Sequence, residues 1–439
     1  MKKKYRIILY TSIFLLCVVA SIILVVKKSN SVYEEESKPK VVKHKSMLSM
    51  NLEQTAGSGD YKTVTQSSWP TEGYKFNAEL SKCENGSTLS WDDTKKAVIM
   101  QGNVSDKCYV YFDIWIPSIA DYCTSGTDLA TCVKNFGDQG PSVSNIYIHN
   151  SSLTNGAGDN SYRYAGANPN NFVCFGSDAS PCPIDNLYRI IGVFGENYHG
   201  ANGKQLVKLI KYDYMTTDEL GTDGDYSQTY KEWGMDSTYK GTYGDGERIG
   251  VYYWNYKATG SATNTWSTSL LNKTNLNTNF INNIGTTWAN KIATVTWKVG
   301  GNTWANIGTK TSSVAYTNEI TNPVTTNTTD NATTYSAKIG LMYVSDYGFA
   351  ASPNAWTLTM SSYNNTTATN NNWMYMGLYE WTISRDAGNS NYAFLVYLGG
   401  SVSFSSVGYN FGVRASFNLE SSVSYVSGSG SMSDPIVIN

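Results

Sequence analysis

The strongest constraint on this chain is an apolar run near its N-terminus, from Ile7 to Val26. As an α-helix these twenty residues would be about 30 Å long, which matches the hydrocarbon thickness of a bilayer. Four basic residues precede the run and two follow it directly. Because positive charge favours the cytoplasmic side, we expect residues 1–28 to be a cytoplasmic tip and a single-pass membrane anchor, with the C-terminal body exported.

A cleaved signal peptide is the alternative interpretation of this run. Cleavage requires small residues at the end of the apolar segment, whereas Ala20 and Ser21 are followed by Ile22 to Val26. Cys17 stands between Leu16 and Val18, which does not match a lipoprotein site. We therefore favour an uncleaved anchor, and cleavage stays open.

The composition of the chain is that of an exported surface rather than of a nucleic-acid-binding protein. Charged residues make up 15% of the chain, against about 25% in ordinary soluble proteins. Its 33 tyrosines are accompanied by abundant Asn, Thr, Ser and Gly, and the net charge is −2. Without a basic field, no nucleic-acid partner is expected.

Six of the seven cysteines lie outside the anchor, and an even number in an exported chain indicates disulfides. We expect neighbours in sequence to pair: Cys83 with Cys108, Cys123 with Cys132, and Cys174 with Cys182. Zinc is the competing interpretation, but the chain has no Cys-x-x-Cys motif and its spacings fit no zinc pattern.

Three regions follow the anchor. Residues 29–68 are polar and charged without apolar periodicity, which predicts a flexible stalk. Residues 69–117 predict a small β-module that a disulfide stabilises, since a core of this size is marginal. Residues 118–439 predict an α+β domain, within which 302–336 are rich in Asn and Thr and are expected to form a surface loop.

Within the larger domain, the clearest prediction is a β-hairpin formed by Leu187 to Phe194 and Gln205 to Lys211. Apolar spacing predicts a helix from Ile119 to about Cys132 and two short helices between Ser267 and Ala293. The last hundred residues predict one twisted antiparallel sheet with a turn at Gly399 and Gly400. Its expected strands are Glu380 to Ser384, Tyr392 to Tyr397, Ser401 to Ser405, Gly412 to Leu419 and Pro435 to Ile438.

Several segments of this domain also resemble an uncharacterised family of exported proteins from Gram-positive gut bacteria. They are Leu187-Tyr-Arg-Ile-Ile-Gly-Val-Phe, the helix start at Trp266-Ser-Thr-Ser-Leu-Leu, the segment from Ala337 to Gly348, Trp373 to Trp381, and Gly412-Val-Arg-Ala-Ser-Phe-Asn-Leu. That family is similar in pattern to the C-type-lectin and formylglycine-generating-enzyme type of fold. The resemblance implies scattered antiparallel strands, a few short helices and one face of irregular loops.

The resemblance does not extend to the activities of those folds. The oxidase branch uses a late pair of cysteines, and none follows Cys182. The calcium-dependent lectin branch uses Glu-Pro-Asn or Gln-Pro-Asp, whereas the nearest strings here are Asn168-Pro-Asn and Ser352-Pro-Asn. The chain therefore lacks both signatures.

The sequence gives only weak signals for catalysis or for metal binding. His149 and His199 stand in loop-like sequence without a catalytic motif, so we interpret them as surface residues. Alternate carboxylates suit calcium, but their spacing here does not match a twelve-residue calcium loop, so no metal or cofactor is expected. The carboxylates in question are Asp223, Asp225, Asp245 and Glu247. A carboxylate pair for glycoside hydrolysis stays open, because such pairs are distant in sequence.

The remaining signal is aromatic, in the last seventy residues. Aromatic rings interleaved with Asn, Ser and Gly are typical of recognition surfaces, although about half of them are expected in the core. The proposed ligand-binding residues are Trp373, Tyr375, Tyr379, Tyr409 and Phe411. Trp381 and Tyr392 are expected in the core, and Arg414 is expected to be a paired structural cation.

These observations favour a membrane-anchored cell-surface protein that displays a lectin-like domain for adhesion or for binding an extracellular glycan or protein. The alternatives are a surface glycan hydrolase and a structural envelope protein without a small ligand.

Overall fold

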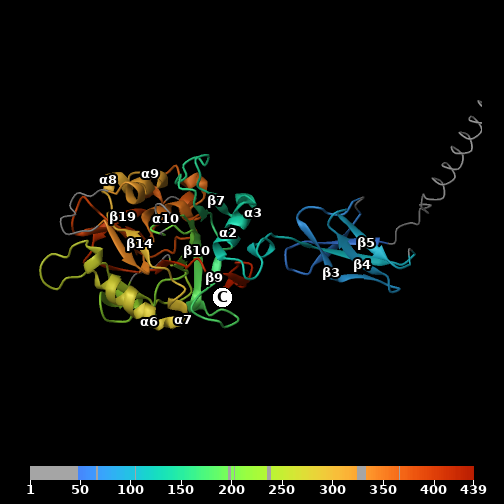
Figure 1. Ribbon diagram of the computed structural model, residues 1–439, viewed down its shortest axis with the longest axis horizontal. Coiled ribbons are helices and arrows are strands. Elements are labelled where there is room, and N and C mark those ends of the chain that lie inside the picture. The colour runs from blue at the N-terminus through green and yellow to red at the C-terminus, as the bar shows by residue number, and fades with distance from the viewer. Residues whose placement is uncertain are drawn as a thin grey trace, which may run out of the picture. The chain divides into compact units, whose positions relative to one another are not determined.

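The computed structural model describes residues 48–439, with gaps at 66–67, 104, 196–198, 202, 235–238, 324–332 and 365. The chain divides into two compact units, Met1–Ile116 and Pro117–Asn439 (Figure 1). Together they form a mixed α+β structure in which most strand pairs are antiparallel. No helix among the described residues is both long and apolar enough to cross a bilayer, and the run from Ile7 to Val26 lies outside them.

The first unit is built on a four-stranded sheet with the order β2-β1-β6-β3 and a separate hairpin. Strand β1 runs parallel to β6, and the other pairs are antiparallel. Its small core consists of Met50, Leu52, Val110 and Phe112, with partly buried aromatic rings packed against it. The strands are β1 (Leu48–Glu53), β2 (Tyr61–Val64), β3 (Tyr74–Cys83), β4 (Thr88–Asp92), β5 (Ala97–Gln101) and β6 (Cys108–Ile114).

Strands β1 and β2 lie within the region that the sequence predicts to be a stalk. Leu48, Met50 and Leu52 alternate with polar residues, which is the pattern of a half-buried strand. This alternation is short and lies in an otherwise charged region, so the polar composition conceals it. The folded unit therefore begins earlier in the chain than expected.

The second unit is organised around a seven-stranded antiparallel sheet. Its order is β16-β21-β11-β10-β8-β7, with β9 also paired to β10. The predicted hairpin is confirmed as its centre, and every residue of β10 and β11 is buried. The strands are β7 (Ile146–Ile148), β8 (Tyr162–Tyr164), β9 (Phe172–Cys174), β10 (Leu187–Phe194), β11 (Leu206–Lys211), β16 (Ile339–Gly340) and β21 (Ser416–Asn418).

The C-terminal segments do not form the single sheet that the sequence predicts. Strands β17, β18 and β19 pair with one another, and the turn at Gly399 and Gly400 joins the last two. Strands β20 and β21 pair instead with strands from earlier in the chain, because long-range partners are not encoded in local alternation. The remaining strands are β12 (Tyr226–Thr229), β13 (Gly250–Tyr253), β14 (Val295–Lys298), β15 (Thr334–Ala337), β17 (Glu380–Arg385), β18 (Tyr392–Val396), β19 (Val402–Ser406), β20 (Asn410–Phe411), β22 (Tyr425–Ser427) and β23 (Val437–Ile438).

Short helices connect these strands (Figure 1). In α2 the Asp128 side chain accepts a hydrogen bond from the Thr131 N–H, as expected of an N-cap. The α-helices are α2 (Leu129–Gly137), α3 (Pro141–Ser144), α4 (Thr217–Leu220), α5 (Tyr230–Trp233), α6 (Ile281–Asn283), α7 (Gly285–Ala289), α8 (Trp304–Ile307), α9 (Ser312–Tyr316), α10 (Val344–Ala350) and α11 (Thr366–Thr369). The 3₁₀-helices are η1 (Ile119–Asp121), η2 (Ile184–Asn186), η3 (Trp266–Thr268), η6 (Pro353–Ala355) and η7 (Met360–Ser362), and the π-helices are η4 (Leu271–Phe280) and η5 (Thr317–Thr321).

The expectation that residues 302–336 form a surface loop is wrong for their first part. Helices α8, α9 and η5 occupy 304–321, and Ile307, Ala315, Tyr316 and Ile320 are buried in the core. These apolar residues recur at helical spacing among Asn and Thr, so composition alone hid an amphipathic pattern. Residues 324–332 lie outside the described part of the chain.

The three predicted disulfides are confirmed. Cys83 pairs with Cys108, Cys123 with Cys132 and Cys174 with Cys182. The first lies within the first unit, and the other two lie within the second.

We predict that the first unit depends on its disulfide. The Cys83–Cys108 bond closes a loop with a sequence separation of 25, and a crosslink of this length stabilises a fold by about 3 kcal/mol. The double variant Cys83→Ala/Cys108→Ala should therefore lower the denaturant midpoint of the first unit and expose it to limited proteolysis, with the cleavage sites assigned by mass spectrometry. The matched variant Cys174→Ala/Cys182→Ala should leave proteolysis of the first unit unchanged. Equal resistance of the first unit in both variants would contradict this dependence.

Candidate functional site

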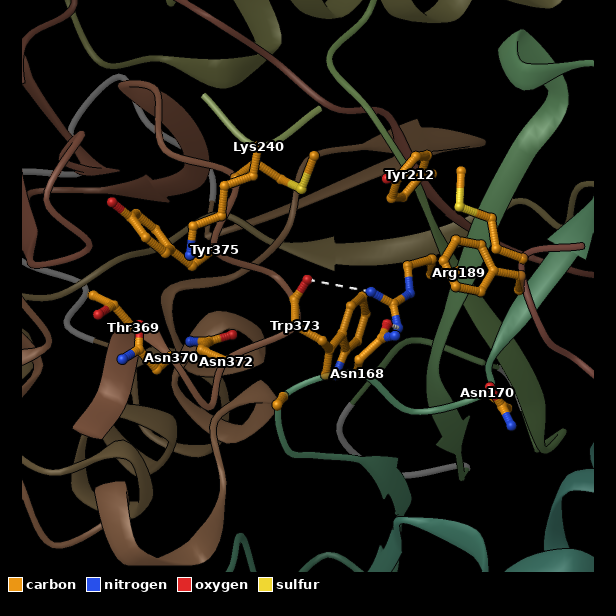
Figure 2. A pocket seen from close by; sticks show the side chains of 14 residues that line it. Asn168, Asn170, Arg189, Tyr212, Lys240, Thr369, Asn370, Asn372, Trp373 and Tyr375 are labelled. Carbon is orange, nitrogen blue, oxygen red and sulfur yellow. Dashed lines mark hydrogen bonds between the residues drawn. The ribbon is translucent and has the colours of Figure 1, made fainter. Parts of the chain in front are cut away.

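The second unit contains a cavity of about 260 Å³ between loops and strand ends that are far apart in the sequence. Such a volume is close to the lower end of the roughly 300–1,000 Å³ typical of small-molecule sites, so it suits one ring-sized group. Figure 2 shows the side chains that line the cavity. The cavity is lined by Ala167, Asn168, Asn170, Phe172, Arg189, Tyr212, Lys240, Thr369, Asn370, Asn372, Trp373, Tyr375, Met376 and Met432.

Arg189 is held in the cavity wall by the central sheet. It lies on β10 opposite Phe172 of β9, and its guanidinium stacks 4.4 Å from the centre of that ring. Its Nε donates to the Asn171 Oδ1 at 2.7 Å, and one Nη donates to the Pro169 carbonyl at 2.8 Å. The strand pairing and these bonds fix the direction of the side chain.

The opposite wall is the loop from Asn372 to Met376. Trp373 stacks 4.6 Å from the Arg189 guanidinium, and its indole N–H donates to the Tyr164 carbonyl at 3.0 Å. Arg414 donates to the Met374 carbonyl at 2.6 Å and forms a paired contact with both carboxylate oxygens of Glu380. The prediction that Arg414 is a paired structural cation is therefore confirmed, and the loop is anchored to the core.

Two cations give the cavity its charge. Burial lowers the pKa of Arg189 to about 9, and the neighbouring Arg414 adds to this effect, while the phenolic group of Tyr212 opposes it. A group with this pKa is still protonated at neutral pH. Lys240 is exposed at the rim, where its ammonium lies 4.3 Å from the centre of the Tyr375 ring (Figure 2). Partial burial lowers the pKa of Lys240.

The structure brings together only part of the predicted ligand-binding set. Trp373 and Tyr375 line the cavity. Tyr379 and Phe411 stack on each other at 5.3 Å in another aromatic cluster, and Phe411 is buried against Trp381. Tyr409 is 60% exposed and is not among the lining residues.

Sequence reasoning did not select Arg189, Lys240 or the Asn168-Pro169-Asn170 string as parts of a site. Two signals pointed to them. Arg189 lies within the apolar run from Leu187 to Phe194, and a buried charged side chain requires a partner. The Asn-Pro-Asn string does not match a calcium signature, but its amides serve equally well to line a polar cavity.

The acidic residues considered for a cation do not converge on one point. Asp245 and Glu247 pair with Lys231, and the Asp223 carboxylate accepts from Asn279. Asp225 is buried and accepts from the backbone N–H groups of Leu270 and Leu271, so it caps a helix. Among the described residues, the one group with metal-ligand geometry is Cys83, Asp106 and Cys108, whose two cysteines are joined in a disulfide.

The interpretation of the two histidines as surface residues is wrong. His149 is fully buried against Phe349 and Trp356. His199 is 8% exposed, and its Nε2 lies 3.2 Å from the Asp159 carboxylate. The sequence missed this because the partners that enclose the rings come from distant segments.

His199 belongs to a buried network of charges that includes side chains from the central sheet. Asp159 pairs with Arg163 at 2.8 Å, and Lys208 pairs with Asp346 at 2.5 Å. All four of these side chains are at most 2% exposed. Such pairs compensate the cost of burying charge and fix one arrangement of the elements that carry them.

A comparison of the chain with protein-family models, with curated proteins and with solved structures finds no significant match.

We predict that the buried histidines make the second unit acid-sensitive. Burial lowers the pKa of both His149 and His199 below 6.5, so the unfolded chain takes up their protons first as the pH falls. Their contribution to stability is therefore complete above pH 6.5 and is lost below it, by at most about 1.4 kcal/mol per pH unit for each ring. The fall in melting temperature of the second unit between pH 7.5 and 5.5 should become smaller in His199→Gln.

The control is His44→Gln, which changes a histidine outside the described residues and within the predicted stalk. It should leave this dependence on pH unchanged. A His199→Gln protein with the full pH dependence of the unaltered chain would contradict the assignment to His199.

Proposed function

We propose that the chain is an exported, membrane-anchored surface protein whose larger unit binds an extracellular saccharide in the cavity around Trp373. The observation that carries this proposal is the composition of the cavity wall. It combines the aromatic rings of Phe172, Tyr212, Trp373 and Tyr375 with four asparagines. Aromatic faces pack against the C–H faces of sugar rings, and amides hydrogen-bond to hydroxyl groups.

Two of these amides are available to a ligand. The Asn170 and Asn370 side chains are exposed at the cavity rim and make no hydrogen bond to other described residues. By contrast, Asn372 donates to the Tyr347 carbonyl and accepts from the Met374 N–H, so its amide is engaged within the fold. The cavity thus combines a fixed aromatic wall with adaptable polar groups, a combination favoured at recognition surfaces.

The same lining favours binding over hydrolysis. Glycoside hydrolysis requires two carboxyl groups beside the scissile bond. The described lining of this cavity contains no Asp, Glu, His or Cys. The alternative of a surface glycan hydrolase therefore has no support at this site.

Export and anchoring rest on separate observations. The three disulfides are typical of proteins that fold in an oxidising compartment. The run from Ile7 to Val26 supports a membrane anchor, as its length and flanking charges predict. A lectin-like role in adhesion or ligand capture is the function that unites an anchored body with a polar, aromatic cavity.

We predict that removing the two available amides weakens saccharide binding without unfolding the protein. The double variant Asn170→Ala/Asn370→Ala should lower affinity for saccharides recovered from a glycan array at least about fivefold, because each lost hydrogen bond is worth about 1 kcal/mol. Titration calorimetry on the full-length chain measures the affinity. The melting temperature should stay the same, since both side chains are exposed.

Asn282→Ala is the matched control, because Asn282 is exposed and is not among the cavity residues. If the unaltered protein binds no saccharide on the glycan array but still binds protein partners, the proposal is overturned in favour of a structural envelope component.

A further inference from the structure

The central hairpin carries three buried cations, and one of them has no carboxylate partner among the described residues. Lys208 pairs with the Asp346 carboxylate at 2.5 Å, and Lys211 pairs with the Glu219 carboxylate at 2.5 Å. Arg189 is only 4% exposed, yet its partners are neutral oxygens. No carboxylate of the described residues lies within salt-bridge distance of it, although β10 and β11 are otherwise supplied with counter-charges.

The cavity beside Arg189 is also without negative charge. Its lining includes Arg189 and Lys240 but no acidic residue of the described chain. Lys240 lies against the Tyr375 ring, and no described carboxylate is within 4 Å of its ammonium. Two cations that face one cavity and lack counter-ions create a positive potential there, which the low dielectric of the interior strengthens.

The hydrogen-bonding capacity of Arg189 is not exhausted. Its contacts with the Trp373 carbonyl and the Asn168 Oδ1 are both long, at 3.4 Å. Figure 2 shows the guanidinium beside the Trp373 ring and directed toward the Trp373 carbonyl. A guanidinium fork matches the two oxygens of a carboxylate, and such a charge-assisted contact is shorter and stronger than one with a neutral oxygen.

We propose that the saccharide bound in this cavity carries a carboxylate, as uronic and sialic acids do, and that Arg189 and Lys240 bind that group. This inference rests on the proposed function and specifies its ligand class. The carboxylate supplies the counter-charge that Arg189 lacks, while the sugar ring lies against the aromatic wall. Asn170 and Asn370, at the rim of the cavity, then hydrogen-bond to hydroxyl groups of the saccharide.

Two disaccharides that differ only in one carboxylate test the proposal. One ends in glucuronic acid and the other in glucose, and each is titrated calorimetrically into the full-length protein. The acidic disaccharide should bind about tenfold more tightly at low salt, because its carboxylate forms charge-assisted bonds. This preference should fall as the salt concentration rises, since salt screens the exposed Lys240.

Lys240→Gln is the informative variant, because Lys240 is exposed at the rim and its loss should not unfold the protein. It should weaken binding of the acidic disaccharide about three- to fivefold and weaken binding of the neutral one by a smaller factor. Lys257→Gln, which removes an exposed lysine outside the cavity, should change neither. Arg189→Lys keeps the charge but loses the fork, and it should weaken acidic binding further.

The outcomes separate this inference from the proposed function. Equal affinities for the two disaccharides, unaffected by Lys240→Gln but reduced by Asn170→Ala/Asn370→Ala, would overturn the carboxylate assignment and leave saccharide binding intact. Binding of neither disaccharide, nor of any other saccharide, would overturn the proposed function itself. Preferential binding of an aspartate-rich peptide over the acidic disaccharide would overturn the saccharide class.

Discussion

Burying positive charge in the central hairpin is the constraint on which the second unit depends. Each buried cation must find a counter-charge or a set of neutral acceptors, because an isolated buried ion is strongly destabilising. Lys208 obtains its partner from α10 and Lys211 from α4. Both partners follow the hairpin in the sequence, Glu219 by 8 residues from Lys211 and Asp346 by 138 from Lys208, so the ion pairs help to determine which helices lie against the sheet. Arg189 meets the same requirement with backbone carbonyls and amides, and it thereby becomes part of a cavity wall.

The sequence predicted the elements whose signals are local. The hairpin of β10 and β11 follows from two apolar runs, and the three disulfides follow from pairing cysteines that are near in sequence. Strand β1 and helices α8 and α9 were missed because their apolar residues are embedded in charged or Asn-rich sequence. In both places the apolar residues follow the strand or helix period, so periodicity was a better guide than composition.

The site was predictable only in part, for a related reason. Trp373 and Tyr375 stood out as aromatic rings among polar residues, and both line the cavity. Tyr379, Phe411 and Tyr409 have the same local pattern but lie elsewhere, since the pattern does not report which segments meet. Arg189 and Lys240 are far apart in the sequence, and the absence of acidic side chains from the described lining of their cavity is a property of the assembled fold. The two histidines are buried because side chains from distant segments complete their enclosure, such as Phe349 and Trp356 around His149 and Tyr316 beside His199, and the local sequence does not show this.

The local connectivity of the cysteines bears on how the chain matures. Their sequence separations are 25, 9 and 8, and no bond spans another. Short loops close with little entropic cost, so in the export that we propose each cysteine could meet its native partner before the next pair follows it. An oxidase that acts on thiols in order of their arrival would thus produce the native set directly. The export that we propose would therefore place little demand on disulfide isomerases.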